Sequence, residues 1–229
     1  MAQHPRLLLP PNKEPDILHI AKTPEEAVMM WGRHFRSAEL GALKGEGSTY
    51  YSMTPHHSDV SEFALRAIGP SLRMIYLVRH PIRRIESHLA HDYAVGRLEK
   101  SDFNTAALEN SLYVSCSDYG KQIAPWIRTF GRGNVLLLLF EDLVTSREAT
   151  VKKAVNFLGV NALDLPIRKE ISNKKGSQLQ SRSSIVSTII NSQVYQTRLR
   201  QVIPNSMHRL AKTILMRRRP VVDVVLQDR

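Results

Sequence analysis

The segment from Val78 to Ser87 has the residue types best suited to bind a doubly charged anion. Arg79 directly follows an apolar run that begins at Leu72, and Ser87 comes about two helical turns later. A guanidinium, a hydroxyl and the backbone N–H groups of a helix start can together surround a phosphate monoester. The spacing alone leaves another interpretation open, in which Arg79 pairs with a carboxylate and Ser87 is a surface residue.

The order of several motifs points to a known family. The pattern Arg-x-Pro-x-x-Arg-x-x-Ser of residues 79–87 resembles the 3'-phosphate-binding motif of sulfotransferases that use 3'-phosphoadenosine-5'-phosphosulfate (PAPS), especially heparan sulfate sulfotransferases and their bacterial relatives. Further segments follow the order of that family, over about residues 4 to 182: Lys13-Glu14-Pro15, Gly45-Glu46-x-Ser48-x-x-Tyr51, Ser117-x-Tyr119, Phe140-Glu141-Asp142-Leu143 and Phe157-Leu158-Gly159.

The resemblance implies roles for individual residues. Glu14 is expected to act as general base on the acceptor, with Lys13 stabilising negative charge beside it. Lys175 and Gly176 resemble the late loop that closes over the donor, where glycine allows close backbone approach. PAPS is the expected co-substrate and leaves as 3'-phosphoadenosine-5'-phosphate (PAP). No metal is expected, because positioned cations and backbone donors can stabilise a charge-dispersed transferring group.

The acceptor is expected to offer a hydroxyl or an amine, and a carbohydrate hydroxyl is the first candidate. Many relatives that act on glycosaminoglycans have a histidine where this chain has Asp16, and a lysine where it has Gly47. Both differences argue against a glycosaminoglycan acceptor. They do not affect donor binding.

The elements that must position these residues follow from hydrophobic periodicity. Apolar runs predict strands at 72–78 and 135–140, and the alternation of strands with helices indicates an α/β fold: a P-loop-NTPase-like three-layer sandwich around a parallel sheet, in one domain over residues 1–229. The expected helices run from a cap at Thr23 to near Gly41, from Ser58 or Asp59 to Gly69, from Pro81 through Leu89, over 104–130 with an interruption at Gly120 or Pro125, and from Ser146 to Gly159, with basic helical stretches near 198–200 and 217–219.

One expected part of the family pattern is missing. The family places a Lys-x-Gly-Thr-Thr type loop for the 5'-phosphosulfate between its first strand and first helix, and no such loop occurs in this sequence. The sequence is therefore expected to be truncated at its N-terminus, without the first strand and that loop. On this interpretation the chain as given can be inactive, since the missing loop normally holds the transferred group.

Composition leaves two alternative functions. The 32 Lys and Arg residues exceed the 21 Asp and Glu residues, giving a formal net charge of +11 that suits polyanionic partners. A basic polyanion- or nucleic-acid-binding module is one alternative, although no recognised nucleic-acid motif is present. A P-loop nucleotide kinase-like phosphotransferase is the other, although the chain has no Gly-x-x-x-x-Gly-Lys-Ser/Thr loop.

Location and partners are only broadly constrained. The single cysteine, Cys116, is expected to be a buried structural thiol, in keeping with a reducing compartment. No apolar run is long enough for a membrane span and no signal sequence is visible, so a cytoplasmic location is expected. The expected partners are the nucleotide donor and a small-molecule or glycan acceptor, without a specific nucleic acid; the oligomeric state stays open.

Overall fold

The computed structural model describes residues 4–12, 14–35, 41–98, 102–161, 179–181, 216–218 and 222–226. These residues fall into two compact units. Unit 1 comprises Met1–Ile85 and Ala106–Arg168, and unit 2 comprises Glu86–Thr105 and Lys169–Arg229. Each unit is described by itself, and the expectation of a single domain over residues 1–229 stays a prediction.

A parallel strand pair lies at the centre of unit 1. Strand β3 (Met74–Val78) pairs in parallel with β4 (Val135–Leu139), so that Met74 lies opposite Val135 and Val78 opposite Leu139. Both strands were predicted, but β3 begins at Met74 rather than at Leu72. Strand β4 ends one residue earlier than expected, because Phe140 is the first residue of helix α8 (Phe140–Thr145). Two acidic residues in the first turn of α8 favour a helix start there.

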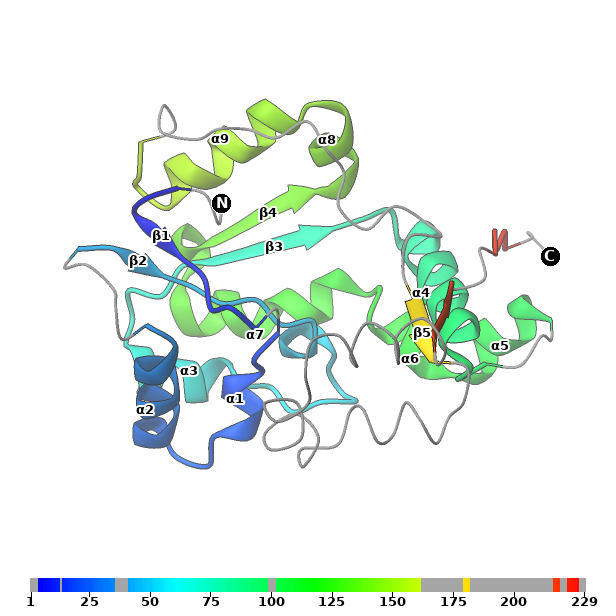
Figure 1. The fold of residues 1–229 in the computed structure, drawn as a ribbon, viewed down its shortest axis with the longest axis horizontal. Coiled ribbons are helices and arrows are strands. Elements are labelled where there is room, and N and C mark those ends of the chain that lie inside the picture. Colours follow the sequence, from blue (N-terminus) through cyan, green and yellow to red (C-terminus); the bar gives the residue numbers. More distant parts are fainter. Residues whose placement is uncertain are drawn as a thin grey trace. The chain divides into compact units, whose positions relative to one another are not determined.

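Helices cover the strand pair on two sides. In Figure 1, helix α7 (Tyr119–Phe130) lies below the pair, while α8 and α9 (Arg147–Phe157) lie above it. Strands β1 (Leu7–Leu8) and β2 (Leu43–Lys44) form a second short parallel pair, and Leu7 packs against Val155 of α9. This arrangement confirms the predicted α/β class with parallel strands between helical layers.

The predicted helix over 104–130 is wrong in one respect, because the structure divides it into three. These are α5 (Phe103–Glu109), α6 (Ser111–Ser115) and α7. The breaks fall at short polar residues that cap the next helix: the Asn110 side chain accepts from the Leu112 N–H at 3.0 Å, and Asp118 accepts from the Lys121 N–H. Gly120 and Pro125, the expected interruptions, both lie inside α7.

The helices that begin at Pro24, Pro81 and Arg147 start as expected. The helix expected to be capped by Ser58 or Asp59 begins slightly later, at Ser61. Helix α2 (Pro24–His34) is capped by Thr23, which accepts from the Glu26 N–H at 3.2 Å, but it ends at His34 rather than near Gly41. A short helix that the sequence did not predict, α1, precedes it. The remaining helices and the short 3-10 turns have these bounds: α1 Ile17–Ile20, η1 Tyr50–Ser52, α3 Ser61–Ile68, α4 Pro81–Val95 and η2 Arg132–Asn134.

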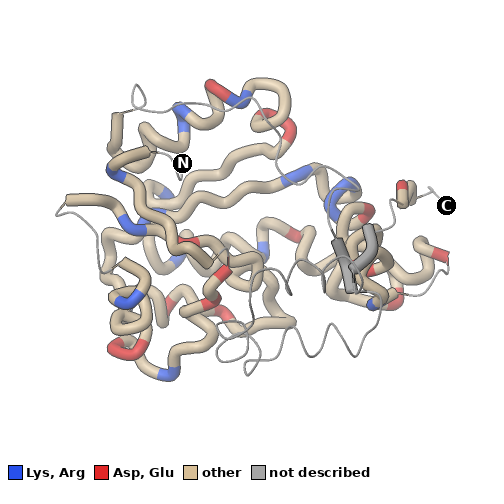
Figure 2. The backbone as a smooth tube through the Cα atoms, viewed as in Figure 1, with Lys and Arg blue, Asp and Glu red and all other residues tan. Residues whose placement is uncertain are grey.

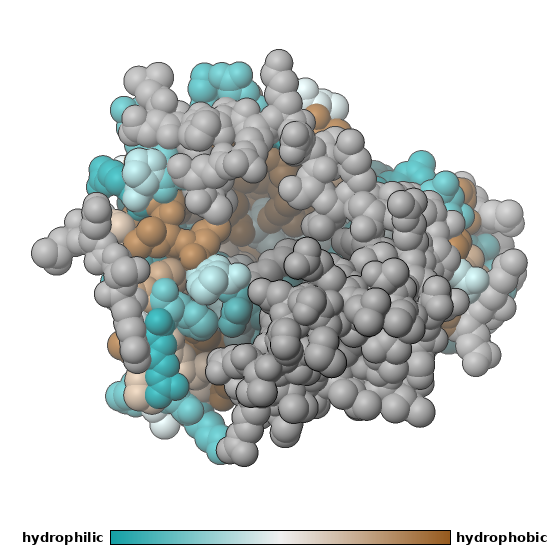
Figure 3. All heavy atoms as spheres, in the orientation of Figure 1, coloured by the Kyte–Doolittle hydropathy of each residue, from teal (hydrophilic) through white to brown (hydrophobic). Residues whose placement is uncertain are grey.

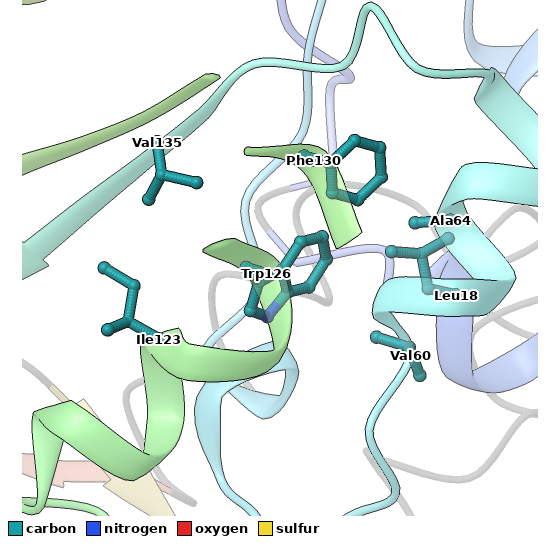
Figure 4. Packing of buried hydrophobic residues seen from close by; sticks show 7 residues of the cluster. All are labelled: Leu18, Val60, Ala64, Ile123, Trp126, Phe130 and Val135. Carbon is teal, nitrogen blue, oxygen red and sulfur yellow. The ribbon is translucent and has the colours of Figure 1, made fainter. Parts of the chain in front are cut away.

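The main core of unit 1 lies between α7, α3 and the strand pair. Trp126 stacks on Phe130 with their ring centroids 5.9 Å apart. Figure 4 shows these rings among aliphatic side chains from α1, the α3 region and β4. The buried cluster consists of Leu18, Val60, Ala64, Ile123, Trp126, Phe130 and Val135. Helix α7 is therefore fixed to both the sheet and the N-terminal helices.

Unit 2 contains most of α4 and a short antiparallel strand pair. The Asp92 carboxylate lies 3.6 Å from both His88 Nε2 and Arg97 Nη1. Strand β5 (Leu179–Ser181) pairs with β6 (Met216–Arg218). The expectation of a helix around 217–219 is therefore wrong at Arg217 and Arg218, because pairing with a distant strand cannot be inferred from local composition.

Apolar side chains stay exposed where the strand pair ends. Leu77, Leu139 and Phe140 are 43%, 50% and 37% exposed. Hydrophobic residues are also visible among hydrophilic ones in the part of Figure 3 that corresponds to β1 and β4 in Figure 1. In open α/β sheets ligands bind beyond the carboxyl ends of the strands, so this edge is where a site is expected.

No helix in the described part of the chain is long and apolar enough to cross a membrane.

Replacing Trp126 by alanine should destabilise the fold strongly. The side chain is 3% exposed and its indole Nε1 donates to the Tyr51 carbonyl at 3.3 Å. We expect Trp126→Ala to lower the free energy of unfolding by about 3–5 kcal/mol in a denaturant titration. Leu108→Ala, at a side chain that is 77% exposed, should change it by less than about 0.5 kcal/mol. A loss below about 1 kcal/mol at Trp126 would contradict the core assignment.

Candidate functional site

Arg79 emerges at the carboxyl end of β3, beside the corresponding end of β4. Because Val78 lies opposite Leu139 in a parallel pair, the next residues, Arg79 and Phe140, leave the sheet at the same edge. The Arg79 guanidinium lies over the Phe140 ring, 5.2 Å from its centroid. Blue segments mark this end of β3 and the start of α4 in Figure 2. The edge therefore has a cation placed on an aromatic ring.

Two side chains from other elements hold the backbone of the turn after β3. The Arg79 N–H donates to the Tyr119 hydroxyl at 3.2 Å, and the His80 N–H donates to Glu141 Oε1 at 3.1 Å. The Tyr119 ring packs edge-on against Tyr76 of β3, with centroids 5.9 Å apart. Contacts from α7 and α8 thus fix the turn from two sides.

Glu141 accepts a hydrogen bond from the turn and forms no ion pair with Arg79 within 4.0 Å. The hydrogen bond from the His80 N–H lowers the pKa of Glu141, and the nearby Arg79 guanidinium contributes to the lowering. Among the described residues, no carboxylate forms an ion pair with Arg79 within 4.0 Å. The interpretation that Arg79 pairs with a carboxylate therefore finds no support in the described part of the chain.

Ser87 lies on α4 and is exposed. Arg79 belongs to unit 1 and Ser87 to unit 2. The convergence of these two side chains on one phosphate stays a prediction.

A second arginine follows Arg79 near the start of α7. Arg84 Nη1 lies 3.5 Å from the Ser117 hydroxyl, which itself donates to the Tyr113 carbonyl at 2.9 Å. Cys116, beside Ser117, is 1% exposed, and burial raises the pKa of its thiol. A buried thiol with a raised pKa is mostly protonated, which fits the structural role predicted for Cys116.

The segment that contains the predicted catalytic pair joins the Gly-Glu loop. Glu14 is exposed, whereas Lys13 lies outside the described residues. Asp16 has a left-handed backbone (φ 52°), a conformation that aspartate tolerates better than most residues. Its carboxylate accepts a hydrogen bond from the Ser48 hydroxyl. The structure thus brings together two of the motifs noticed in the sequence.

A buried pair strengthens the same junction. The Tyr51 hydroxyl donates to Glu46 and accepts from the Leu18 N–H at 3.0 Å. Burial raises the pKa of Glu46, and the hydrogen bond from Tyr51 opposes that rise. Burial also raises the pKa of Tyr51, with Glu46 adding to the rise. The pair holds α1, and hence the residues that lead into it, against the loop.

Three aromatic rings lie next to this junction. The His57 ring is 4.5 Å from the Tyr50 ring and 5.3 Å from the His19 ring, centroid to centroid. His19 Nε2 is also 3.2 Å from the Tyr50 carbonyl oxygen. Tyr50 is 39% exposed, so the cluster offers an aromatic surface, and its His19 belongs to the helix that directly follows Asp16.

Helix α7 connects the loop to the strand end. Gln122 is buried, and its amide donates to the carbonyls of Thr54 and Ser115 at 2.7 and 2.9 Å. Its oxygen accepts from the Thr54 N–H and hydroxyl at 2.9 and 3.0 Å. Tyr119, at the first turn of the same helix, binds the Arg79 backbone. One helix therefore supports both parts of the candidate site.

The structure describes three of the six predicted site residues. Glu14, Arg79 and Ser87 are described, while Lys13, Lys175 and Gly176 lie outside the described residues. Sequence reasoning noticed the motifs with Tyr119, Phe140 and Glu141 but gave these residues no role. Their positions could have suggested a role, because Tyr119 begins α7 and Phe140 and Glu141 directly follow β4. Among described residues, no group of three or more His, Cys, Asp or Glu side chains is arranged to hold a metal ion.

The raised pKa of Glu46 makes part of the stability depend on pH. A group whose pKa is higher in the folded chain favours folding below its unfolded pKa, and this contribution is lost as pH rises through the folded value. The free energy of unfolding of the unmodified chain, relative to Glu46→Gln, should therefore fall as pH rises above about 4.5 and through the raised pKa of folded Glu46. Denaturant titrations across that range measure it.

A matched exposed glutamate should behave in the opposite way. The hydrogen bond with Lys152 lowers the pKa of Glu148, so the stability relative to Glu148→Gln should rise slightly as pH increases to about 4.5 and stay level above it. A flat or rising difference for Glu46→Gln would contradict the burial assigned to the Glu46–Tyr51 pair.

Comparison with known proteins identifies the fold and the family of the chain. The structure is similar to the crystal structure of a sulfotransferase from Alicyclobacillus acidocaldarius, with a TM-score of 0.58 and 20% identity over 75% of this chain and 78% of that chain. It also matches the sulfotransferase domain from the curacin biosynthetic pathway, with a TM-score of 0.45 and 20% identity over 63% of this chain and 49% of that chain. No curated protein sequence matches the chain.

The family model gives the decisive match. The sulfotransferase domain model matches residues 48–214, a stretch that includes Arg79, Ser87 and Tyr119 and begins after Glu14 and Glu46. The resemblance noticed in the sequence is confirmed, and sulfuryl transfer is the activity of such a domain. Because this match spans more than half of its 229 residues, the chain belongs to the sulfotransferase domain family.

Proposed function

We propose that the chain binds PAPS and transfers its sulfuryl group to a hydroxyl or amine of an acceptor. Arg79 and Ser87 bind the 3'-phosphate of the donor in this proposal. One observation carries this proposal. The Arg79 guanidinium lies at the carboxyl end of β3 and over an aromatic ring, and it has no ion-pair partner among the described residues. A phosphate monoester there gains charge-assisted hydrogen bonds.

The backbone around Arg79 supports this assignment. Hydrogen bonds from the N–H groups of Arg79 and His80 to Tyr119 and Glu141 fix the turn before a ligand arrives. Binding then requires little ordering of the turn, which reduces the entropic cost of association. Lys175 and Gly176 close over the donor in the same proposal, on the strength of their motif alone.

The proposed chemistry uses Glu14 as general base. As the acceptor oxygen or nitrogen attacks sulfur, Glu14 takes its proton, and the bond between sulfur and the bridging phosphate oxygen breaks. The leaving group is PAP, and Lys13 stabilises the negative charge that develops near the transferring group. The assignment of Glu14 is supported by its motif and by the Asp16–Ser48 hydrogen bond, which anchors its segment on the Gly-Glu loop.

We propose a neutral carbohydrate hydroxyl as the acceptor rather than a polyanionic glycosaminoglycan. The carboxylates of Asp16 and Glu46 lie at the junction beside Glu14, and Figure 2 shows red segments close to α1. Negative charge there would repel sulfated or carboxylated chains. The rings of Tyr50 and His57 provide a surface against which a sugar face can pack.

Titration of PAP into the purified chain tests donor binding. Arg79→Ala should weaken PAP binding by about 2 kcal/mol or more, as expected when a charge-assisted contact is lost. Arg66→Ala is the matched control, because Arg66 also lies over a phenylalanine ring (Phe63, 5.9 Å) but on α3, which Figure 1 shows away from the arrowheads of β3 and β4. Isothermal titration calorimetry gives both affinities.

Two results would refute the donor assignment. One is equal PAP affinity in Arg79→Ala and the unmodified chain. The other is a preference for magnesium-ATP over PAP, which would favour a phosphotransferase.

Replacing Glu14 by glutamine should separate catalysis from donor binding. We expect Glu14→Gln to reduce sulfuryl transfer from radiolabelled PAPS by about 10²- to 10⁴-fold, because the amide cannot accept the proton. PAP affinity should stay unchanged. Cellobiose, heparosan oligosaccharides, 2-naphthol and hexylamine serve as acceptor probes, and Glu25→Gln, on α2, is the control. Full activity of Glu14→Gln would assign the base to another group.

A further inference from the structure

We infer that Phe140 is a positioning residue for donor recognition: its ring holds the Arg79 guanidinium in place for the 3'-phosphate. The inference rests on the proposed function, because it assumes that Arg79 binds that phosphate. Neither the motif pattern nor the family match assigns a role to Phe140.

The strand register brings the two side chains together. Val78 and Leu139 are partners at the carboxyl ends of β3 and β4, so Arg79 and Phe140 are the next residue of each chain. The guanidinium carbon lies 5.2 Å from the centre of the Phe140 ring, within the range of a cation–π interaction. The contact is thus built into the end of the sheet.

Exposure of Phe140 argues against a role in core packing. The side chain is 37% exposed, and it does not belong to the buried cluster formed by α7, α3 and β4. The exposed position of this large apolar side chain at a strand end is explained by its contact with the Arg79 guanidinium, which the ring holds in place.

An aromatic ring is a suitable support for a ligand-binding arginine. A carboxylate at position 140 would hold the guanidinium more strongly, but it would also neutralise the charge that attracts phosphate. The face of a phenylalanine ring attracts the cation without carrying a formal charge. Arg79 can therefore be oriented in advance and still offer its N–H groups to a phosphate.

The backbone contacts alone do not orient the side chain. Tyr119 and Glu141 bind the N–H groups of Arg79 and His80, which fixes the path of the turn. The Arg79 side chain has several rotatable bonds beyond that point, and restricting them in advance reduces the entropy lost on binding. The Phe140 ring contacts the guanidinium group itself.

The test compares two nucleotides that differ at the 3' position. PAP carries the 3'-phosphate, whereas adenosine 5'-diphosphate does not. We expect Phe140→Leu to bind PAP about three- to tenfold more weakly and adenosine 5'-diphosphate unchanged. Phe140→Tyr keeps an aromatic face and should retain PAP affinity within about twofold. Val144→Ala, at another exposed apolar residue of α8, is the control.

The outcomes separate the inference from the proposed function. Equal weakening of both nucleotides in Phe140→Leu, or unchanged PAP affinity while Arg79→Ala loses it, would overturn the role of Phe140 and leave donor binding intact. Unchanged PAP affinity in Arg79→Ala would instead overturn the proposed function. A denaturant titration confirms that each variant is folded, and Phe140→Met provides the same comparison should the leucine variant unfold.

Discussion

The burial of α7 is the constraint on which the rest of unit 1 depends. Its middle carries Trp126 into the core, where the indole also binds the Tyr51 carbonyl. Its Gln122 amide makes four hydrogen bonds to residues 54 and 115, so a buried polar group is fully satisfied. Because unsatisfied buried groups are costly, these contacts specify one position for the helix against the loop.

This position of α7 relates two chemical regions that are far apart in the chain. At one end of the helix, Tyr119 binds the backbone of Arg79 at the strand end. Further along, Trp126 binds Tyr51, whose hydroxyl connects Glu46 with the start of α1. The strand edge that we propose for the donor and the segment with Glu14 are therefore supported by the same helix, which suits transfer between two bound substrates.

The two regions differ in charge although the whole chain is basic. The strand edge carries Arg79, with Arg84 following in α4, whereas the junction beside Glu14 carries Asp16 and Glu46. The anionic donor and the uncharged acceptor that we propose suit these opposite surroundings. The net charge of +11 by itself fits many polyanion-binding proteins, and its distribution is the more informative property.

Local patterns in the sequence determined the two central strands, several helix starts and the family, because these depend on neighbouring residues: an apolar run for β3 and β4, a capping side chain at Thr23, and the spacing of residues 79–87. They did not determine where the helix over 104–130 breaks, because Asn110 and Asp118 compete with an apolar stripe that continues past them. Nor did they reveal the contacts of Arg79 with Phe140 and Tyr119. Those contacts follow from the parallel register of two strands and the packing of α7, which join residues distant in the chain, and only the tertiary structure decides such pairings.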